Sequence, residues 1–207
     1  MKLKTLTTAI ILATVPMTGA FAAALDRSGQ SIAAFLQPGN YFEAGLSVLD
    51  PNVSGKARPT SGSGTLSDMA GDYYFPSAAL KIQATDHFSV GLIYDQPFGA
   101  DATYSVSDPL VGPGTGLFHA NGEATAVDVT TQNLSLILGY QPTENWNIYG
   151  GAAYQTFKGD VKLRGAAYGT TTAFGGYNAN IDEDGAVGWL AGIAYQIPEI
   201  ALKASLT

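Results

Sequence analysis

The 207-residue sequence contains no cysteine, and its 10 lysines and arginines are outnumbered by 17 aspartates and glutamates. The absence of thiols excludes disulfide scaffolds, thiolate zinc sites and cysteine nucleophiles. The formal net charge of −7 argues against a nucleic-acid partner, because phosphate binding needs basic patches. Charged residues make up 13%, about half the fraction in typical soluble domains. A hydrophobic content of 46% nevertheless excludes a disordered chain.

Hydrophobic runs are short, and the first belongs to an export signal. Lys2 and Lys4 precede a mostly apolar stretch, residues 5–15, that is too short to cross a bilayer as a helix. Small residues at Ala20 and Ala22 form a signal-peptidase site, so residues 1–22 are predicted to be a cleaved signal peptide. An N-terminal anchor helix is the alternative. No later window approaches the ~18–20 apolar residues of a transmembrane helix.

Seven segments of the mature chain alternate between apolar and small or polar residues. Successive side chains of a strand point to opposite faces, so each segment is predicted to be a strand with one apolar face. The segments are Tyr41–Leu49, Ser77–Thr85, Phe88–Asp95, Leu134–Tyr140, Trp146–Gln155, Val187–Gln196 and Ile200–Thr207.

The connections between these segments favour a membrane barrel over a soluble β-sandwich. Tight turns at residues 86–87, 141–145 and 197–199 alternate with long polar connections at residues 50–72, 98–125 and 159–184. Outer-membrane barrels have short periplasmic turns and long external loops. Aromatic residues at strand ends suit a membrane–water boundary. The sequence therefore predicts an all-β, antiparallel transmembrane β-barrel in a bacterial outer membrane, with the sandwich as the alternative.

Seven strands are an odd number for a bacterial single-chain barrel. We therefore expect residues 41–207 to form part of a larger barrel whose remaining strands lie outside this sequence. An unrecognised strand near residues 159–165 or 170–177 is the alternative.

Three segments resemble the FadL family of outer-membrane long-chain fatty acid transporters. They are residues 41–55 (YFEAGLSVLDPNVSG), residues 130–140 with the turn before Trp146, and residues 195–206 (YQIPEIALKASL). Their order and spacing are similar to the first, the fourth and fifth, and the seventh strands of that family. The resemblance implies a fourteen-stranded barrel, of which this chain would carry about half.

The region before the first strand departs from that family. The family carries an N-terminal plug, or hatch, with an Asn-Pro-Ala motif, which is absent from residues 23–40. Residues 28–36 could be a short remnant of the plug. A flexible periplasmic leader is the alternative interpretation.

Residues suited to catalysis or metal binding are few. The two histidines, His87 and His119, lie in a tight turn and a long connection, and no Ser–His–acid arrangement can be argued from spacing. We therefore expect no enzyme, no cofactor and no metal site. The acidic residues Asp160 and 182–184 could bind Ca²⁺, but a solvated acidic loop is the simpler interpretation.

A possible break in the barrel wall follows the third predicted strand. Alternation holds through Tyr94, and a proline and a glycine then occur within five positions, in the run Gln96, Pro97, Phe98, Gly99 and Ala100. Proline cannot donate to a sheet ladder, and glycine adopts dihedrals that other residues avoid. Either the strand simply ends here or the wall is locally open. The family resemblance implies a similar kink and a lateral exit for the substrate.

Apolar residues in the long connections form the second candidate site. Solvated loops keep such residues when they pack on something, either one another or a captured acyl chain. The candidate substrate-binding residues are Leu110, Leu117, Phe118, Tyr168 and Phe174.

The sequence and the resemblance together predict passive uptake of a hydrophobic small molecule across the outer membrane. The expected partners are a long-chain fatty acid or other hydrophobic ligand and outer-membrane lipid, and the barrel is expected to be a monomer. A general porin or structural barrel is the alternative function. A carboxylate head group would need a cation, for which the candidates are Lys56, Arg58, Lys158, Lys162 and Arg164.

Overall fold

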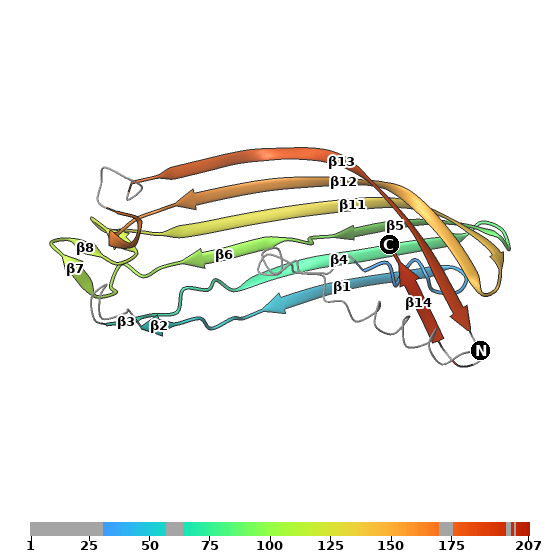
Figure 1. Cartoon of the computed structure of the whole chain (residues 1–207), viewed down its shortest axis with the longest axis horizontal. Coiled ribbons are helices and arrows are strands. Elements are labelled where there is room, and N and C mark those ends of the chain that lie inside the picture. The colour runs from blue at the N-terminus through green and yellow to red at the C-terminus, as the bar shows by residue number, and fades with distance from the viewer. Residues whose placement is uncertain (1–30, 57–63, 170–175, 198–199, 201) are drawn as a thin grey trace, which may run out of the picture.

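The computed structural model describes residues 31–56, 64–169, 176–197, 200 and 202–207. They form a curved antiparallel sheet that closes half of a barrel, with strand order β1-β4-β5-β11-β12-β13-β14 and with β6 also paired to β11. Figure 1 shows β1, β4, β5, β11 and β12 side by side along the long axis of the molecule, with β14 oblique at the right-hand end. The strands are β1 (Tyr41–Leu49), β4 (Tyr73–Gln83), β5 (Phe88–Asp95), β6 (Gly99–Thr103), β11 (Ala126–Thr143), β12 (Trp146–Lys162), β13 (Asn178–Ile197) and β14 (Leu202–Leu206). The predicted all-β antiparallel fold is thus confirmed.

Long and short connections lie at opposite ends of the sheet. The long connections carry short strands that gather at the left of Figure 1 and form separate small sheets. One of these sheets pairs β2 (Gly55–Lys56) with β3 (Thr65–Leu66). The other joins β7 (Leu110–Gly112), β8 (Thr115–Gly116), β9 (His119–Ala120) and β10 (Glu123–Ala124). A 3-10 turn, η1 (Ala166–Tyr168), lies in the connection from β12 to β13.

The later strands extend beyond their apolar segments. The predicted connection at residues 159–184 is shorter in the structure, because β12 continues to Lys162 and β13 begins at Asn178. In these extensions the outward residues are polar, as in the pair Asp128–Asp160. Backbone ladder bonds need no apolar side chain, so alternation marks the apolar band of a strand rather than its full length.

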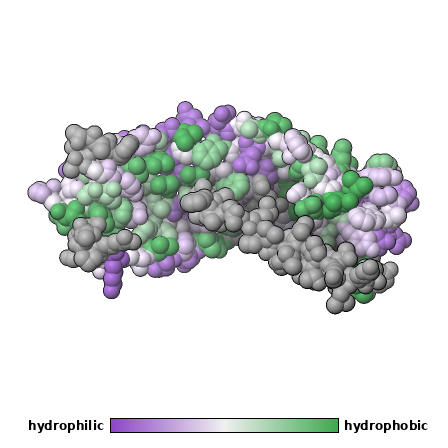
Figure 2. Space-filling view, viewed as in Figure 1, coloured by the Kyte–Doolittle hydropathy of each residue, from purple (hydrophilic) through white to green (hydrophobic). Residues whose placement is uncertain are grey.

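The two faces of the sheet differ as the alternation predicts. Leu136, Ile148 and Trp189 point outward and are 51%, 49% and 84% exposed, whereas Ser135, Asn147 and their inward neighbours are buried. In Figure 2, apolar side chains gather over the strands, and a paler, more polar group covers the tight-turn end at the right. The apolar face is therefore the outer one.

The core lies on the concave face and includes a segment from before β1. Residues 32–37 form a helical turn, in which the Leu36 amide donates to the Ile32 carbonyl at 3.3 Å. Phe35 is 1% exposed and packs edge-on against Tyr149, with a centroid distance of 5.9 Å. The buried cluster is Phe35, Leu36, Ile137, Tyr149 and Ala194. Within the described residues, no helix has the length and apolar character needed to cross a membrane.

Candidate ligand site

The wall of the sheet is irregular between β5 and β6. Asp95 lies opposite Asn133 on β11, and Gly99 lies opposite Thr130. Four steps along β5–β6 therefore match three steps along β11, which places one extra residue in the segment around Pro97. An extra residue of this kind is a β-bulge, which bends the strand and disrupts the ladder locally.

A side chain bridges the irregularity on the β11 side. The Thr131 hydroxyl accepts a hydrogen bond from the Phe98 amide at 2.9 Å and donates one to the Phe98 carbonyl at 2.7 Å. Thr131 is 2% exposed, so these bonds lie away from water. One hydroxyl thus bonds both backbone groups of Phe98, a residue that lies between β5 and β6 and outside both strands.

On the other side, the ladder between the described strands is interrupted. The ladder between β4 and β5 ends at the pair Ala78–Tyr94. Contact between the two chains resumes at an isolated bridge, Ala70–Ala102, next to a bond from the Thr103 amide to the Met69 carbonyl at 2.8 Å. Among the described residues, no strand pairing joins β4 to residues 95–100.

A cavity of about 260 Å³ lies beside this opening. Outward residues such as Pro76 and inward residues such as Phe75 both line it, so it reaches through the thickness of the wall. Its lining is Ser31, Ala34, Glu43, Ser47, Phe75, Pro76, Ser77, Ala78, Ala79, Ile93, Tyr94, Asp95 and Gln96.

A second cavity, of about 210 Å³, lies on the concave side. It shares Ser31, Ile93 and Asp95 with the first cavity and extends along β11 to Ser135. Asp95, 5% exposed, therefore faces both spaces. Its carboxylate accepts a hydrogen bond from the Asn133 amide nitrogen at 2.8 Å, and the same nitrogen donates to the Ser135 hydroxyl at 3.1 Å.

Two lysines hold the segment that precedes β1 against the concave face. The Lys81 ammonium donates to the Gln37 carbonyl at 2.6 Å and lies 5.8 Å from the centre of the Phe35 ring. The Lys203 ammonium donates to the Leu36 carbonyl at 2.6 Å. Cations at the carboxyl end of a helical turn suit the partial negative charge of its free carbonyls.

Glycines on the sheet make room for the Phe35 ring. A Cβ atom added at Gly91 would lie 2.3 Å from Phe35 Cδ2, and one added at Gly139 would lie 2.8 Å from Phe35 Cζ. The ring is thus seated in a hollow that only a residue without a side chain provides. We name residues 31–37 the inner segment.

The loop residues singled out from the sequence are only partly brought together. The Phe118 ring stacks on Tyr104 at 4.2 Å and meets Tyr168 edge-on at 5.9 Å, and burial raises the pKa of Tyr104. The Leu117 carbonyl accepts from the Ala167 amide at 2.9 Å in the same cluster. Leu110 lies in β7 and is 61% exposed, and Phe174 lies outside the described residues.

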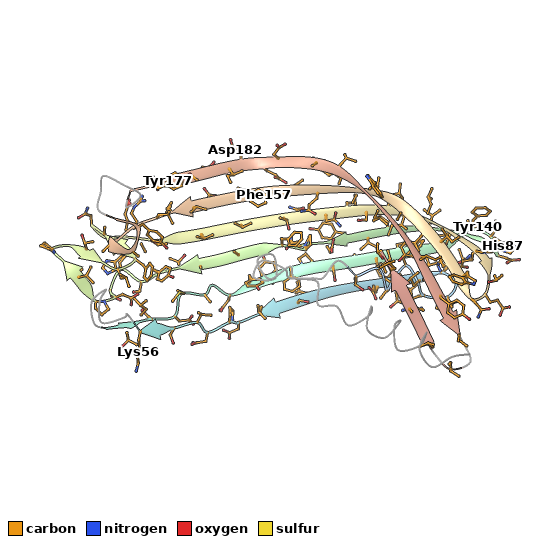
Figure 3. All side chains as sticks on the ribbon, in the orientation of Figure 1. Lys56, His87, Tyr140, Phe157, Tyr177 and Asp182 are labelled. Carbon is orange, nitrogen blue, oxygen red and sulfur yellow. The ribbon has the colours of Figure 1, made fainter. Side chains whose placement is uncertain are left out.

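None of the candidate cations that the structure describes lines either of these two cavities. Arg164 is 8% exposed, pairs with Glu123 at 2.6 Å and donates to the Asn178 side chain at 2.8 Å, so it holds loops together. Lys158 and Lys162 flank Asp128 and Asp160 on the outer face. Figure 3 shows Lys56 at the loop end, pointing away from the strands. Arg58 lies outside the described residues.

Each of the two histidines lies within hydrogen-bond distance of a backbone carbonyl. His87 Nδ1 lies 2.7 Å from the Gln141 carbonyl at the tight-turn end, near the Tyr140 ring (Figure 3). His119 is buried, and its Nε2 lies 2.7 Å from the Asp108 carbonyl. Residues 182–184 belong to β13 rather than to a loop. Among the described residues, no group of three or more acidic or histidine side chains could hold a metal ion.

Several residues at or near the cavities carry no signal in the sequence. Thr131 and Asn133 look like ordinary inward positions until Phe98 and Asp95 are placed beside them, 33 and 38 residues away. Phe35 lies in a segment without periodicity. Glu43 and Asp95, by contrast, occupy the polar face in the alternation, which could have marked them as facing the interior.

Neither the family models nor the curated proteins contain a match to the sequence. Among solved structures, the chain is similar to a crystal structure of a Pseudomonas aeruginosa FadL homologue, with a TM-score of 0.45 and 14% identity. The alignment covers 76% of this chain and 39% of that protein. The chain therefore spans well under half the length of that structure.

Proposed function

We propose that this chain forms part of an outer-membrane β-barrel that lets hydrophobic small molecules pass passively through the wall between β4 and β5–β6. The observation that carries the proposal is the 260 Å³ cavity at the point where the β4–β5 ladder stops. A hydrophobic molecule leaving there would enter lipid directly rather than water.

The outer face supports a membrane location. Along β12, the outward residues run from Trp146 through Ile148 to Tyr154, about nine residues, which matches the ~9–11 tilted residues of a membrane-spanning strand. At the tight-turn end, Trp146 lies 4.8 Å from Tyr195 and Phe88 lies 5.1 Å from Tyr140. Paired aromatics at one level suit the boundary between lipid and water.

The open side of the irregular segment also fits a membrane wall. An unpaired backbone group in hydrocarbon costs several kcal/mol, so a break in a barrel persists where the groups face a cavity or find other partners. Here the Thr131 hydroxyl bonds both backbone groups of Phe98, and Asp95 and Gln96 line the cavity.

We infer the direction of ligand movement from two further features. The aromatic cluster of Tyr104, Phe118 and Tyr168 at the loop end would capture the ligand first. The inner segment packs on the concave face, where it would hinder bulk solvent from crossing while the ligand moves sideways. Long-chain fatty acids, which the sequence resemblance implies, are the first substrate class to test.

Uptake by the intact protein in reconstituted vesicles tests this route. Radiolabelled oleate should enter faster than a hydrophilic sugar of similar mass. The variant Pro97→Val with Gly99→Ala favours a continuous strand and should lower oleate uptake several-fold. The matched control, Pro142→Val with Gly188→Ala, places the same changes at an exposed proline near the end of β11 and at a glycine with open space around it.

Barrel assembly, judged by heat-modifiable gel mobility, must be equal in all three proteins. Unchanged oleate uptake in the Pro97/Gly99 variant would mean that these residues merely end a strand. Equal uptake of the sugar and oleate would favour the general porin.

A further inference from the structure

Charged residues line a hollow on the outer face of the sheet, beyond the end of the apolar band. The hollow has a volume of about 500 Å³, and its lining is Ala126 and Asp128 on β11 with Lys158, Asp160 and Lys162 on β12. We name it the charged hollow. A second hollow, of about 410 Å³, adjoins it on the side of the loops and shares Ala126 and Lys162 with it.

The backbone register explains why these charges lie together. Asp128 and Asp160 are directly paired across β11 and β12, which brings their Cβ atoms to about 4.5–5.5 Å from each other. Lys158 and Lys162 lie two positions on either side of Asp160, and residues two apart share one face of a strand. The Asn180 side chain donates a hydrogen bond to Asp160 at 2.5 Å. Two neighbouring carboxylates therefore lie between two lysines.

These charges are only partly compensated within the protein. Among the described residues, Asp128, Lys158 and Lys162 make no side-chain hydrogen bond or ion pair. The hydrogen bond and charge of Arg164 lower the pKa of Glu123, and the charge of Lys162 adds a smaller effect in the same direction. Glu123 forms its ion pair with Arg164, so the ammonium groups of both lysines remain available to a ligand.

The two signs of charge are equal in number, which favours a ligand that carries both. Two carboxylates and two ammonium groups line the charged hollow. Carboxylates directly opposite each other destabilise a sheet, and Asp101 on β6 extends the row beyond Asp128. A cation between Asp128 and Asp160 would relieve this repulsion, and the two lysines would bind an anion beside it. We propose that the charged hollow binds the zwitterionic headgroup of a membrane lipid, in which a phosphate lies next to a primary ammonium.

The position of the charged hollow favours a lipid over a soluble zwitterion. Lys158 lies beyond Tyr154, the last aromatic residue on the outward face of β12, by about 13 Å along the strand. Because strands of such barrels are tilted by about 40°, this is a height of about 10 Å above the apolar band. A headgroup layer is about 5–8 Å thick, and lysine side chains reach back along the strand toward it. A lipid bound there would keep its acyl chains against the apolar residues of β11 and β12.

Lipid binding to the intact protein in detergent, measured by native mass spectrometry, tests this assignment. The probes are phosphatidylethanolamine and phosphatidylglycerol with identical acyl chains, because only the first carries an ammonium group. Phosphatidylethanolamine should bind about fivefold more tightly, the effect of one surface ion pair. Soluble phosphoethanolamine, which has no acyl chains, should not displace the lipid at equal concentration.

Removal of the negative charges should reverse the preference. Asp128→Asn with Asp160→Asn keeps an acceptor oxygen for Asn180 and leaves the two lysines in place. The hollow of this variant is positively charged, so phosphatidylglycerol should bind at least as tightly as phosphatidylethanolamine. A merely structural role of the two aspartates would lower binding of both lipids together.

Removal of the positive charges should have a different effect. Lys158→Gln with Lys162→Gln removes the groups that bind phosphate, so both lipids should bind several-fold more weakly. Lys56→Gln with Asp86→Asn changes the same kinds of charge at exposed positions outside the hollow, and this matched control should keep the native preference. Heat-modifiable gel mobility must show equal barrel assembly in all variants.

The outcomes separate this inference from the proposed function, with which it shares only the membrane location. Equal binding of the two lipids by the native protein, binding of neither, or an unchanged preference in the Asp128/Asp160 variant would overturn it. Displacement by soluble phosphoethanolamine would overturn the lipid as the partner. The reversed preference, together with oleate uptake that ignores the Pro97/Gly99 variant, would support the lipid site and overturn the lateral route.

Discussion

At the scale of single residues, one hydroxyl maintains the irregular segment. Thr131 supplies both an acceptor and a donor to the backbone of Phe98 and is 2% exposed. Its removal would take these two bonds from the half-buried backbone of Phe98, and leaving a buried polar group unsatisfied costs about 1–3 kcal/mol. A β-branched threonine in this place is therefore more than a strand former.

Thr131→Val keeps the shape of the side chain and removes both hydrogen bonds. We expect the free energy of unfolding in urea to fall by about 1–3 kcal/mol, with faster hydrogen exchange at Phe98. Thr130→Val, at the neighbouring outward position, is the matched control. Equal destabilisation by the two substitutions would show that the Phe98 bonds contribute little.

At the scale of elements, the inner segment is held by lysine side chains from two strands that are far apart in the sheet. Lys81 comes from β4 and Lys203 from β14, and each donates to a carbonyl at the end of one helical turn. Hydrogen bonds from charged donors contribute about 1.5–3 kcal/mol each. A short turn of this kind has little stability of its own, so these contacts and Phe35 burial hold it.

Replacement of both lysines by methionine should loosen the inner segment while keeping most of the apolar stems. The Lys81→Met/Lys203→Met variant is expected to show faster protease cleavage before β1 and a larger single-channel conductance in planar bilayers. Lys158→Met, on the outer face, is the control. Conductance and cleavage equal to those of the control would contradict a role for the lysines.

The loop end contains one charged contact whose strength depends on pH. The hydrogen bond and charge of Arg164 hold the pKa of Glu123 below its ordinary value. Because the folded-state pKa is the lower one, this contact stabilises the loops at neutral pH and loses its effect as the pH falls below about 4. The Glu123 side chain is 66% exposed, so a small effect is expected.

Limited proteolysis of the loops measures that dependence. Cleavage in the connection between β12 and β13 should be faster at pH 3 than at pH 7. The measurement uses an acid-stable protease and corrects for the protease's own rates at the two pH values. Glu123→Gln should remove most of the difference. Equal pH dependence in the variant and the native protein would assign the effect to other groups.

The bounds of the strands also show how much of the fold can be predicted from the sequence. The bounds of β1 and β5 agree with the predicted segments Tyr41–Leu49 and Phe88–Asp95, because both strands are apolar on one face over their whole length. β13 was underestimated at its start, since residues 178–186 alternate little. Packing of Phe35 against Gly91 and Gly139 involves three separate segments, and no local pattern encodes such a contact.

At the scale of the whole molecule, β1 and β14 are the two edge strands of the sheet that the described residues form. Six antiparallel steps separate these strands, so they run in the same direction. A second copy in the same membrane orientation would therefore meet both edges in parallel. Closure as an antiparallel barrel takes an odd number of further strands, a condition that the fourteen strands implied by the resemblance satisfy.

The lengths of the connections predict which end of the sheet faces the cell exterior. The long connections between β1 and β4, β6 and β11, and β12 and β13 all lie at one end, and the tight turns at the other (Figure 1). External loops of such barrels are long, and periplasmic turns are short. Val111, exposed in β7, should therefore face the cell exterior, and Glu144, in the turn between β11 and β12, should face the periplasm.

Single cysteines at these positions test the orientation, and the native chain contributes no background because it has no cysteine. On intact cells, a membrane-impermeant maleimide should label Val111→Cys and should leave Glu144→Cys unlabelled until the outer membrane is permeabilised. Labelling of both after permeabilisation is the control for accessibility. The reverse pattern on intact cells would invert the orientation, and the aromatic cluster of Tyr104, Phe118 and Tyr168 would then lie on the wrong side to capture a ligand first.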